Sequence, residues 1–210
     1  MATQREILKR INSVKNTQKI TRTMEMVSTA KMKKMQDRIV MSKPYSEKLE
    51  TIIEHLRQTG VEDVFDPLMQ ERPDPNRILI LMITGNRGLC GGFNTRIIEN
   101  TIGFKSKLTI EEGKEVLVYS IGKKGTNYLR FIKEPMFKSV LNPEDKFKFD
   151  DASKLGEELI NLFVTGEVDE VYVSYTKIMT RSTQKATISR LLPLKPEGGA
   201  IQESVEEFHV

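Results

Sequence analysis

The first 59 residues of this chain contain no glycine and a single proline, Pro44, a composition that favours one long helix. Apolar residues recur there at steps of three and four, the spacing of one helix face. A capping box at Thr3 and Glu6 marks the start of the helix, and Gly60 marks its end. The stretch therefore predicts an α-helix over residues 4–58, about 80 Å long.

A helix of this length is too long for the rest of the chain to cover, so we expect it to project. Its apolar stripe then needs a second helix or another protein as a mate. The alternative is a helix that breaks at Pro44 and folds back as a hairpin. The stripe is rich in methionine, which suits a surface that contacts several partner geometries, although ordinary core filling is the competing interpretation.

Charge is concentrated in the same segment. Residues 1–60 hold 13 Lys/Arg and 6 Asp/Glu (13 − 6 = +7), and the remainder holds 20 and 23 (20 − 23 = −3). A basic helix on a near-neutral body indicates an acidic partner.

Several function classes are excluded by residue counts. Cys90 is the only cysteine, so the chain has no internal disulfide and no thiolate zinc site, and two histidines, His55 and His209, make no metal cluster. No apolar run reaches the ~20 residues of a membrane span, and the first residues lack the apolar core of a signal peptide. We expect a protein of a reducing compartment, with no cofactor and no metal.

Beyond a polar, proline-punctuated linker at residues 61–76, strand and helix patterns alternate. We expect strands over 77–84, 115–121, 136–141, 170–176 and 186–192, and helices over 93–107, from 122, and over 151–164. This alternation predicts a Rossmann-like, mainly parallel, doubly wound α/β domain over residues 77–196, followed by an acidic tail at 197–210.

A glycine-rich turn, Gly85 to Gly92, follows the first predicted strand and precedes a helix, as phosphate-binding loops do. Its glycines, at 85, 88, 91 and 92, match neither the P-loop nor the dinucleotide spacing. Three interpretations stay open: tight backbone packing, a protein-contact loop that presents Arg87, Leu89 and Cys90, and a nucleotide or phosphate site.

The +7 helix also leaves a nucleic-acid binder open, although the helix has an apolar stripe and no aromatic residue before Tyr45. Catalytic constellations are scarce. The carboxylate pairs Glu111–Glu112 and Glu157–Glu158 lie in charged stretches that predict solvated faces, so we expect no catalytic residue.

Several separated motifs resemble one family. Residues 3–7 (TQREI), 12–20 (NSVKNTQKI), 24–27 (MEMV) and 31–34 (KMKK) resemble the N-terminal helix of the gamma subunit of F-type ATP synthases. Residues 87–94 (RGLCGGFN) resemble the glycine-rich signature of that family, and residues 191–194 (LLPL) resemble the segment that closes its α/β domain. The motifs agree in order and spacing from residue 2 to about 195.

The resemblance implies a central-stalk rotor. In this family the N- and C-terminal helices form an antiparallel coiled coil inside a ring of three alpha and three beta subunits, and the α/β domain lies near the epsilon subunit and the membrane ring of c subunits. Proton flow turns the rotor, which drives the beta subunits through ATP synthesis or hydrolysis. The implied location is peripheral, on the cytoplasmic face of a bacterial plasma membrane, without membrane insertion or nucleic-acid binding.

The resemblance also implies roles for individual residues. The coiled-coil seam is Ile7, Ile11, Val14, Ile20, Val27 and Met35. Contacts to an acidic lever loop of beta are assigned to Met24, Lys31, Lys33, Lys34, Arg87, Gly88, Leu89 and Cys90. The family's second long helix is missing after residue 210, which favours a truncation over the alternative of a natural variant with a partner in trans. A lone cysteine without a transit peptide indicates the bacterial type.

Overall fold

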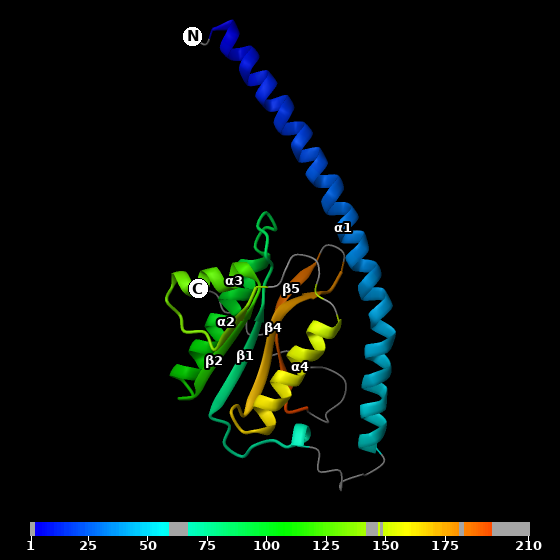
Figure 1. The fold of residues 1–210 in the computed structure, drawn as a ribbon, viewed down its shortest axis with the longest axis vertical. Helices are drawn as coiled ribbons and strands as arrows, with labels where there is room; N and C mark the ends of the chain where they lie inside the picture. The colour runs from blue at the N-terminus through cyan, green and yellow to red at the C-terminus, as the bar shows by residue number, and fades with distance from the viewer. Residues whose placement is uncertain (1–2, 59–66, 142–146, 148, 181–182, 195–210) are drawn as a thin grey trace. The chain divides into compact units, whose positions relative to one another are not determined.

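The structure is a computed structural model that describes residues 3–58, 67–141, 147, 149–180 and 183–194 (Figure 1). The chain divides into two compact units, Met1–Thr59 and Gly60–Val210. The predicted linker residues 61–66 and the predicted acidic tail lie outside the described residues.

The first unit is one helix, α1, over Gln4–Gln58. At its start the carboxylate of Glu6 accepts the N–H of Thr3 at 2.8 Å, which is one half of the predicted capping box, while the N–H of Glu6 donates to the Thr3 carbonyl at 2.9 Å. Pro44 lies inside the helix without ending it. The hairpin alternative is therefore wrong: the proline removes one hydrogen bond, and the turns on either side hold the helix together.

The second unit contains a five-stranded sheet in the order β3-β2-β1-β4-β5. Its strands are β1 (Arg77–Ile83), β2 (Glu115–Ile121), β3 (Lys138–Val140), β4 (Glu170–Ile178) and β5 (Gln184–Leu192). All neighbouring strands are parallel except β4 and β5. The mainly parallel α/β fold is confirmed, and a short helical turn, η1 (Pro67–Met69), precedes it.

Helices cover both faces of the sheet: α2 (Phe93–Ile110) and α3 (Lys123–Phe131) pack on one, and α4 (Phe149–Val164) packs on the other (Figure 1). The central strand β1 supplies both cores. Leu79 and Leu81 join the α4 side, whereas Ile80 and Met82 join the α2 and α3 side. Burial on both faces explains the unbroken apolar run of this strand.

Two glycines let the start of α3 approach β1. A Cβ on Gly122, whose φ is +99°, would overlap the backbone carbonyl of Thr84. A Cβ on Gly125 would lie 2.6 Å from Cε of Met82 and 2.8 Å from Oγ1 of Thr84. The Thr84 hydroxyl uses this proximity to accept the N–H of Gly125 at 2.9 Å and to donate to the carbonyl of Ile121 at 3.1 Å.

The segment that leads into β1 is tied to the start of β4 by a carboxylate. Asp169 Oδ1 pairs with Arg72, and Oδ2 accepts the N–H groups of Asn76 and Arg77 at 2.9 and 2.8 Å. Burial alone disfavours the charge of Asp169, but these N–H donors and the guanidinium outweigh it and lower the pKa of the carboxyl.

We expect Gly122→Ala to lower the free energy of unfolding by about 2–5 kcal/mol, because a left-handed backbone penalty adds to an overlap with backbone atoms. Gly113→Ala is the matched control: its φ is +68°, but no atom lies within 4 Å of the added Cβ, so only about 1–2 kcal/mol is expected. Urea unfolding followed by circular dichroism measures both. Equal losses would contradict the steric role of Gly122.

We expect Asp169→Asn to lower the free energy of unfolding at pH 7 by about 1.5–3 kcal/mol, the usual value of hydrogen bonds to a charged group. Because the folded pKa is depressed, this stability is present above the ordinary value of 3.8 and is lost as the pH falls through the folded pKa. The difference between wild type and variant should therefore shrink below pH 3.8. Urea titrations from pH 7 to pH 2.5 check this, and a constant difference would contradict it.

Candidate protein-contact site

The apolar seam predicted on α1 is exposed to solvent. Its six side chains are 37–64% exposed, and they are Ile7, Ile11, Val14, Ile20, Val27 and Met35. The seam has a first cluster, Ile7, Ile11 and Val14, and a second that begins at Ile20. Because Ile20 comes six residues after Val14, the second cluster faces a direction about 120° from the first. An exposed apolar stripe of this extent marks a contact surface, and more than one partner surface is needed to cover both clusters.

The predicted contact residues of α1 surround the helix and do not share a single face. Met24 is 46% exposed, and Lys31, seven residues later, lies on the same side. Lys33 follows Lys31 by two residues and so points to the opposite side. Lys34 and Lys33 are exposed, whereas Lys31 is half-buried. The basic groups thus form a collar, which presents positive charge to partners on several sides.

The predicted contact residues of the second unit share one loop, Gly85–Gly92, at the carboxyl end of β1. Asn94, in the first turn of α2, fastens this loop from inside. Its Oδ1 accepts the N–H of Gly85 at 2.8 Å, and its Nδ2 donates to the carbonyl of Arg87 at 3.3 Å and to Sγ of Cys90 at 3.1 Å. Asn94 is 9% exposed, so the loop is held by a buried amide whose three bonds fix its course.

The first backbone N–H groups of α3 fasten the same loop from its other side. Lys123 N–H donates to Oδ1 of Asn86 at 2.9 Å, and Lys124 N–H donates to the carbonyl of Gly85 at 3.1 Å. The loop therefore satisfies helix-terminal donors that otherwise need a cap or a ligand.

The tip of the loop presents an apolar side chain. Leu89 is 93% exposed and has a φ of +59°, a left-handed conformation that costs about 1–2 kcal/mol for a residue with a Cβ. Arg87, Gly88 and Cys90 beside it are exposed as well. An exposed apolar side chain on a strained backbone is compatible with the predicted contact role of Leu89, which stays a prediction.

The loop needs glycine at different positions for different physical reasons. A Cβ added to Gly85 would lie 3.2 Å from Oδ1 of Asn94, so close packing explains the glycine at this position. Gly91 has nothing within 4 Å but a φ of +57°, so the packing interpretation is wrong for it and backbone conformation is the reason. Among the described glycines, the tightest contacts are those of Gly122 and Gly125. The sequence placed Gly122 at the start of a helix but predicted no close approach there.

The nucleotide interpretation gains no support from this geometry. The N–H of Gly85, which a phosphate cradle would direct at its ligand, is bonded to Asn94 instead. Among the residues that the structure describes, no three His, Cys, Asp or Glu side chains lie together as metal ligands. The side chain of His55 and the whole of His209 fall outside that description.

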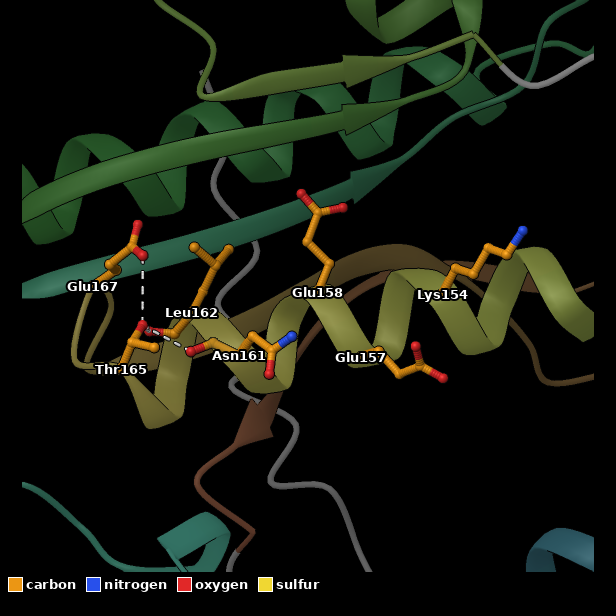
Figure 2. Close-up of a pocket in the computed structure, with 7 residues that line it drawn as sticks. All are labelled: Lys154, Glu157, Glu158, Asn161, Leu162, Thr165 and Glu167. Atoms are coloured by element: carbon orange, nitrogen blue, oxygen red, sulfur yellow. Dashed lines mark hydrogen bonds between the residues drawn. The ribbon is translucent and has the colours of Figure 1, made fainter.

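A shallow pocket of about 330 Å³ on α4 gathers charged groups, and Figure 2 shows its lining. Within it, Glu158 accepts a hydrogen bond from Nζ of Lys138 at 2.6 Å and one from the Tyr119 hydroxyl at 3.2 Å. Burial, together with the charge of Glu158, raises the pKa of Tyr119. The prediction of a solvated face holds for Glu157, Glu111 and Glu112 and is wrong for Glu158, which is half-buried.

These carboxylates do not form an acid–base pair of the kind that hydrolases use. Glu158 points toward the sheet and Glu157 points away from it, while Glu167 bonds to the Thr165 hydroxyl (Figure 2).

In the described part of the chain, every helix is too short or too polar to cross a membrane.

Comparisons with known proteins agree with one another. A family model described as ATP synthase matches residues 3–210. The ATP synthase gamma chain of Gloeobacter violaceus is 35% identical over 206 residues, which cover 97% of this chain and 64% of that relative. The gamma chain of Halothermothrix orenii is 39% identical over 204 residues, which cover 97% of this chain and 69% of that relative. The chain thus spans less than two thirds of the length of the first relative.

A solved structure has a similar fold. It is the central stalk and c-ring of the mitochondrial ATP synthase of Tetrahymena thermophila, with a TM-score of 0.64 and 20% identity. The match covers 83% of this chain and 72% of the solved chain. At this identity the likeness concerns the fold alone.

We expect Asn94→Ala to release the loop and lower the free energy of unfolding by about 1–3 kcal/mol, because the N–H of Gly85 and the carbonyl of Arg87 lose their bonds to this buried amide. Hydrogen exchange should speed up at the Gly85 amide while the strand amides stay protected. Asn100→Ala is the control, since its amide donates one bond, to the carbonyl of Ala186 at 3.1 Å, away from the loop. Unchanged exchange at Gly85 in Asn94→Ala would contradict the fastening role.

Proposed function

The chain belongs to the family of ATP synthase gamma chains, and we propose that it is the central-stalk rotor subunit of an F-type ATP synthase. In this role α1 is half of an antiparallel coiled coil that turns inside a ring of three alpha and three beta subunits. The observation that carries the proposal is the exposed apolar seam of α1, since a 55-residue helix with such a stripe needs partners along its length.

The rotor acts through differential contact. Each orientation of the shaft favours a different conformation of each beta subunit, because a contact that differs between two states shifts their populations. The basic collar of α1 suits this task, since Lys31 and Lys33 lie on opposite sides of the helix and an acidic lever loop of beta can meet positive charge in more than one orientation. Leu89 at the tip of the glycine loop is a second contact, with Arg87, Gly88 and Cys90 around it.

The chain contributes no catalytic residue in this proposal, and ATP forms at the beta subunits. The epsilon subunit and the membrane ring of c subunits are the partners of the α/β domain. We place the complex on the cytoplasmic face of a bacterial plasma membrane, where this chain is peripheral.

Charge reversal at Lys31, Lys33 and Lys34 to glutamate tests the proposal in membrane vesicles that carry the assembled complex. We expect proton-driven ATP synthesis to fall about tenfold, because three attractive contacts to an acidic loop become repulsive, at about 0.5 kcal/mol or more each. The control replaces the same three residues by arginine, which keeps the charge and should keep the rate within twofold.

Native mass spectrometry of the released complex reports assembly in each variant. Three copies each of two larger subunits together with one copy of this chain are expected throughout. A complex that assembles and synthesises ATP at the wild-type rate after charge reversal would contradict the contact assignment. A chain that joins no such ring would contradict the rotor itself.

A further inference from the structure

The α/β domain is attached to the rest of the chain at one edge of its sheet. Strand β1 begins at this edge with Arg77. Strand β5 runs antiparallel to β4 and returns to the same edge, where Leu192 pairs with Val171 near the start of β4. The glycine loop follows the opposite end of β1. The start of β1 and the end of β5 therefore both lie on the side of the domain away from the contact loop.

The segment before β1 is held to this edge by one arginine. Nη1 of Arg72 lies 2.5 Å from Oδ1 of Asp169, and its Nη2 donates to the carbonyl of Phe163 at 2.6 Å. The guanidinium also lies over the Phe163 ring, 5.3 Å from its centroid. The two charged side chains are only 31% and 17% exposed, so water screens this pair less than an ordinary surface pair.

The same carboxylate reaches the strand itself. Its second oxygen accepts the backbone N–H groups of Asn76 and Arg77, and the N–H of Asp169 donates to the carbonyl of Arg77 at 2.7 Å. Asp169 thus joins the segment before β1, the first residues of β1 and the turn that leads into β4. The bonds to its carboxylate are charge-assisted, the strong class of hydrogen bond.

The outgoing strand is tied to the incoming segment as well. The N–H of Leu194 donates to the carbonyl of Leu68 at 2.8 Å. Nη2 of Arg190 on β5 lies 2.8 Å from Oε1 of Glu71, and Nη1 lies 3.4 Å from Oε1 of Glu170. The chain that arrives at the domain and the chain that leaves it are thereby bonded to each other as well as to the sheet.

We propose that this set of residues, which we call the edge clamp, is the joint that passes torque between the α/β domain and helix α1. It consists of Leu68, Glu71, Arg72, Asp169, Arg190 and Leu194. The proposal rests on the proposed rotor function. Without the clamp, a pull on the segment before β1 acts directly on the first hydrogen bonds of the strand and opens them one after another. With the clamp, several charge-assisted bonds share the load in parallel.

The test variant is Asp169→Asn, which keeps the shape of the side chain and removes its charge. The matched control is Glu134→Gln, the same change in a pair of similar exposure, because Glu134 binds Lys105 at 2.6 Å and the two are 27% and 19% exposed. Both are placed in assembled complexes in membrane vesicles. We expect Asp169→Asn to lower proton-driven ATP synthesis at least fivefold while ATP hydrolysis stays within twofold. Glu134→Gln should leave both within twofold.

Arg72→Lys is a second variant, because lysine keeps the charge but cannot bond both Asp169 and the Phe163 carbonyl. It should reduce synthesis by a factor between those of wild type and Asp169→Asn. Because the change is milder, Arg72→Lys still tests the clamp if complexes with Asp169→Asn do not assemble. Hydrogen exchange reports the clamp directly: the amides of Asn76 and Arg77 should exchange at least tenfold faster in Asp169→Asn, while those of Ile80 and Val118 stay protected.

Three results would overturn the proposal. Synthesis within twofold of wild type, with fast exchange at Asn76 and Arg77, overturns the clamp while the rotor function stands. An equal loss in Glu134→Gln also overturns it, since any weakened ion pair would then have the same effect. Wild-type vesicles that carry the chain and make no ATP overturn the rotor function, and the clamp proposal with it.

Discussion

Strand β1 is buried on both faces, and the arrangement of the second unit depends on that burial. Leu79 and Leu81 need α4 on one side, while Ile80 and Met82 need α2 and α3 on the other. A strand with this demand has to lie in the middle of the sheet, with helices on both sides. Its two ends then define two opposite edges, and each edge carries one of the two candidate functional features of the unit.

Each edge is stiffened by one side chain that makes several bonds. At the carboxyl edge, the amide of Asn94 fixes the loop that presents Leu89. At the amino edge, the carboxylate of Asp169 fixes the segment that leads into β1. Polar groups that are partly buried and fully bonded hold one geometry, because every alternative leaves a donor or acceptor unpaired. The proposed rotor function needs this rigidity at both edges, because force would enter and leave the domain there.

Helix α1 depends on other chemistry. Its seam side chains are exposed. Helix propensity and the bond between Thr3 and Glu6 hold an isolated helix only marginally, and in the proposed rotor the packing against partner subunits supplies the rest. Helix α1 is therefore the element that is simplest to predict from the sequence, although it has little stability when isolated.

The amino-acid sequence by itself determined what depends on local pattern: the extent of α1, the alternation of strands and helices, and the glycine loop after the first strand. Periodicity and backbone freedom act over a few residues, so they can be read along the chain. Only the tertiary structure decided that Pro44 leaves α1 unbroken, that Asn94 fastens the loop, that Gly122 meets Thr84, that Glu158 is paired, and that Arg72 reaches Asp169 across 97 positions. The fate of Pro44 depends on the hydrogen bonds of the turns around it, and the side-chain contacts depend on strand order, register and the close approach of elements, which no single stretch of sequence contains.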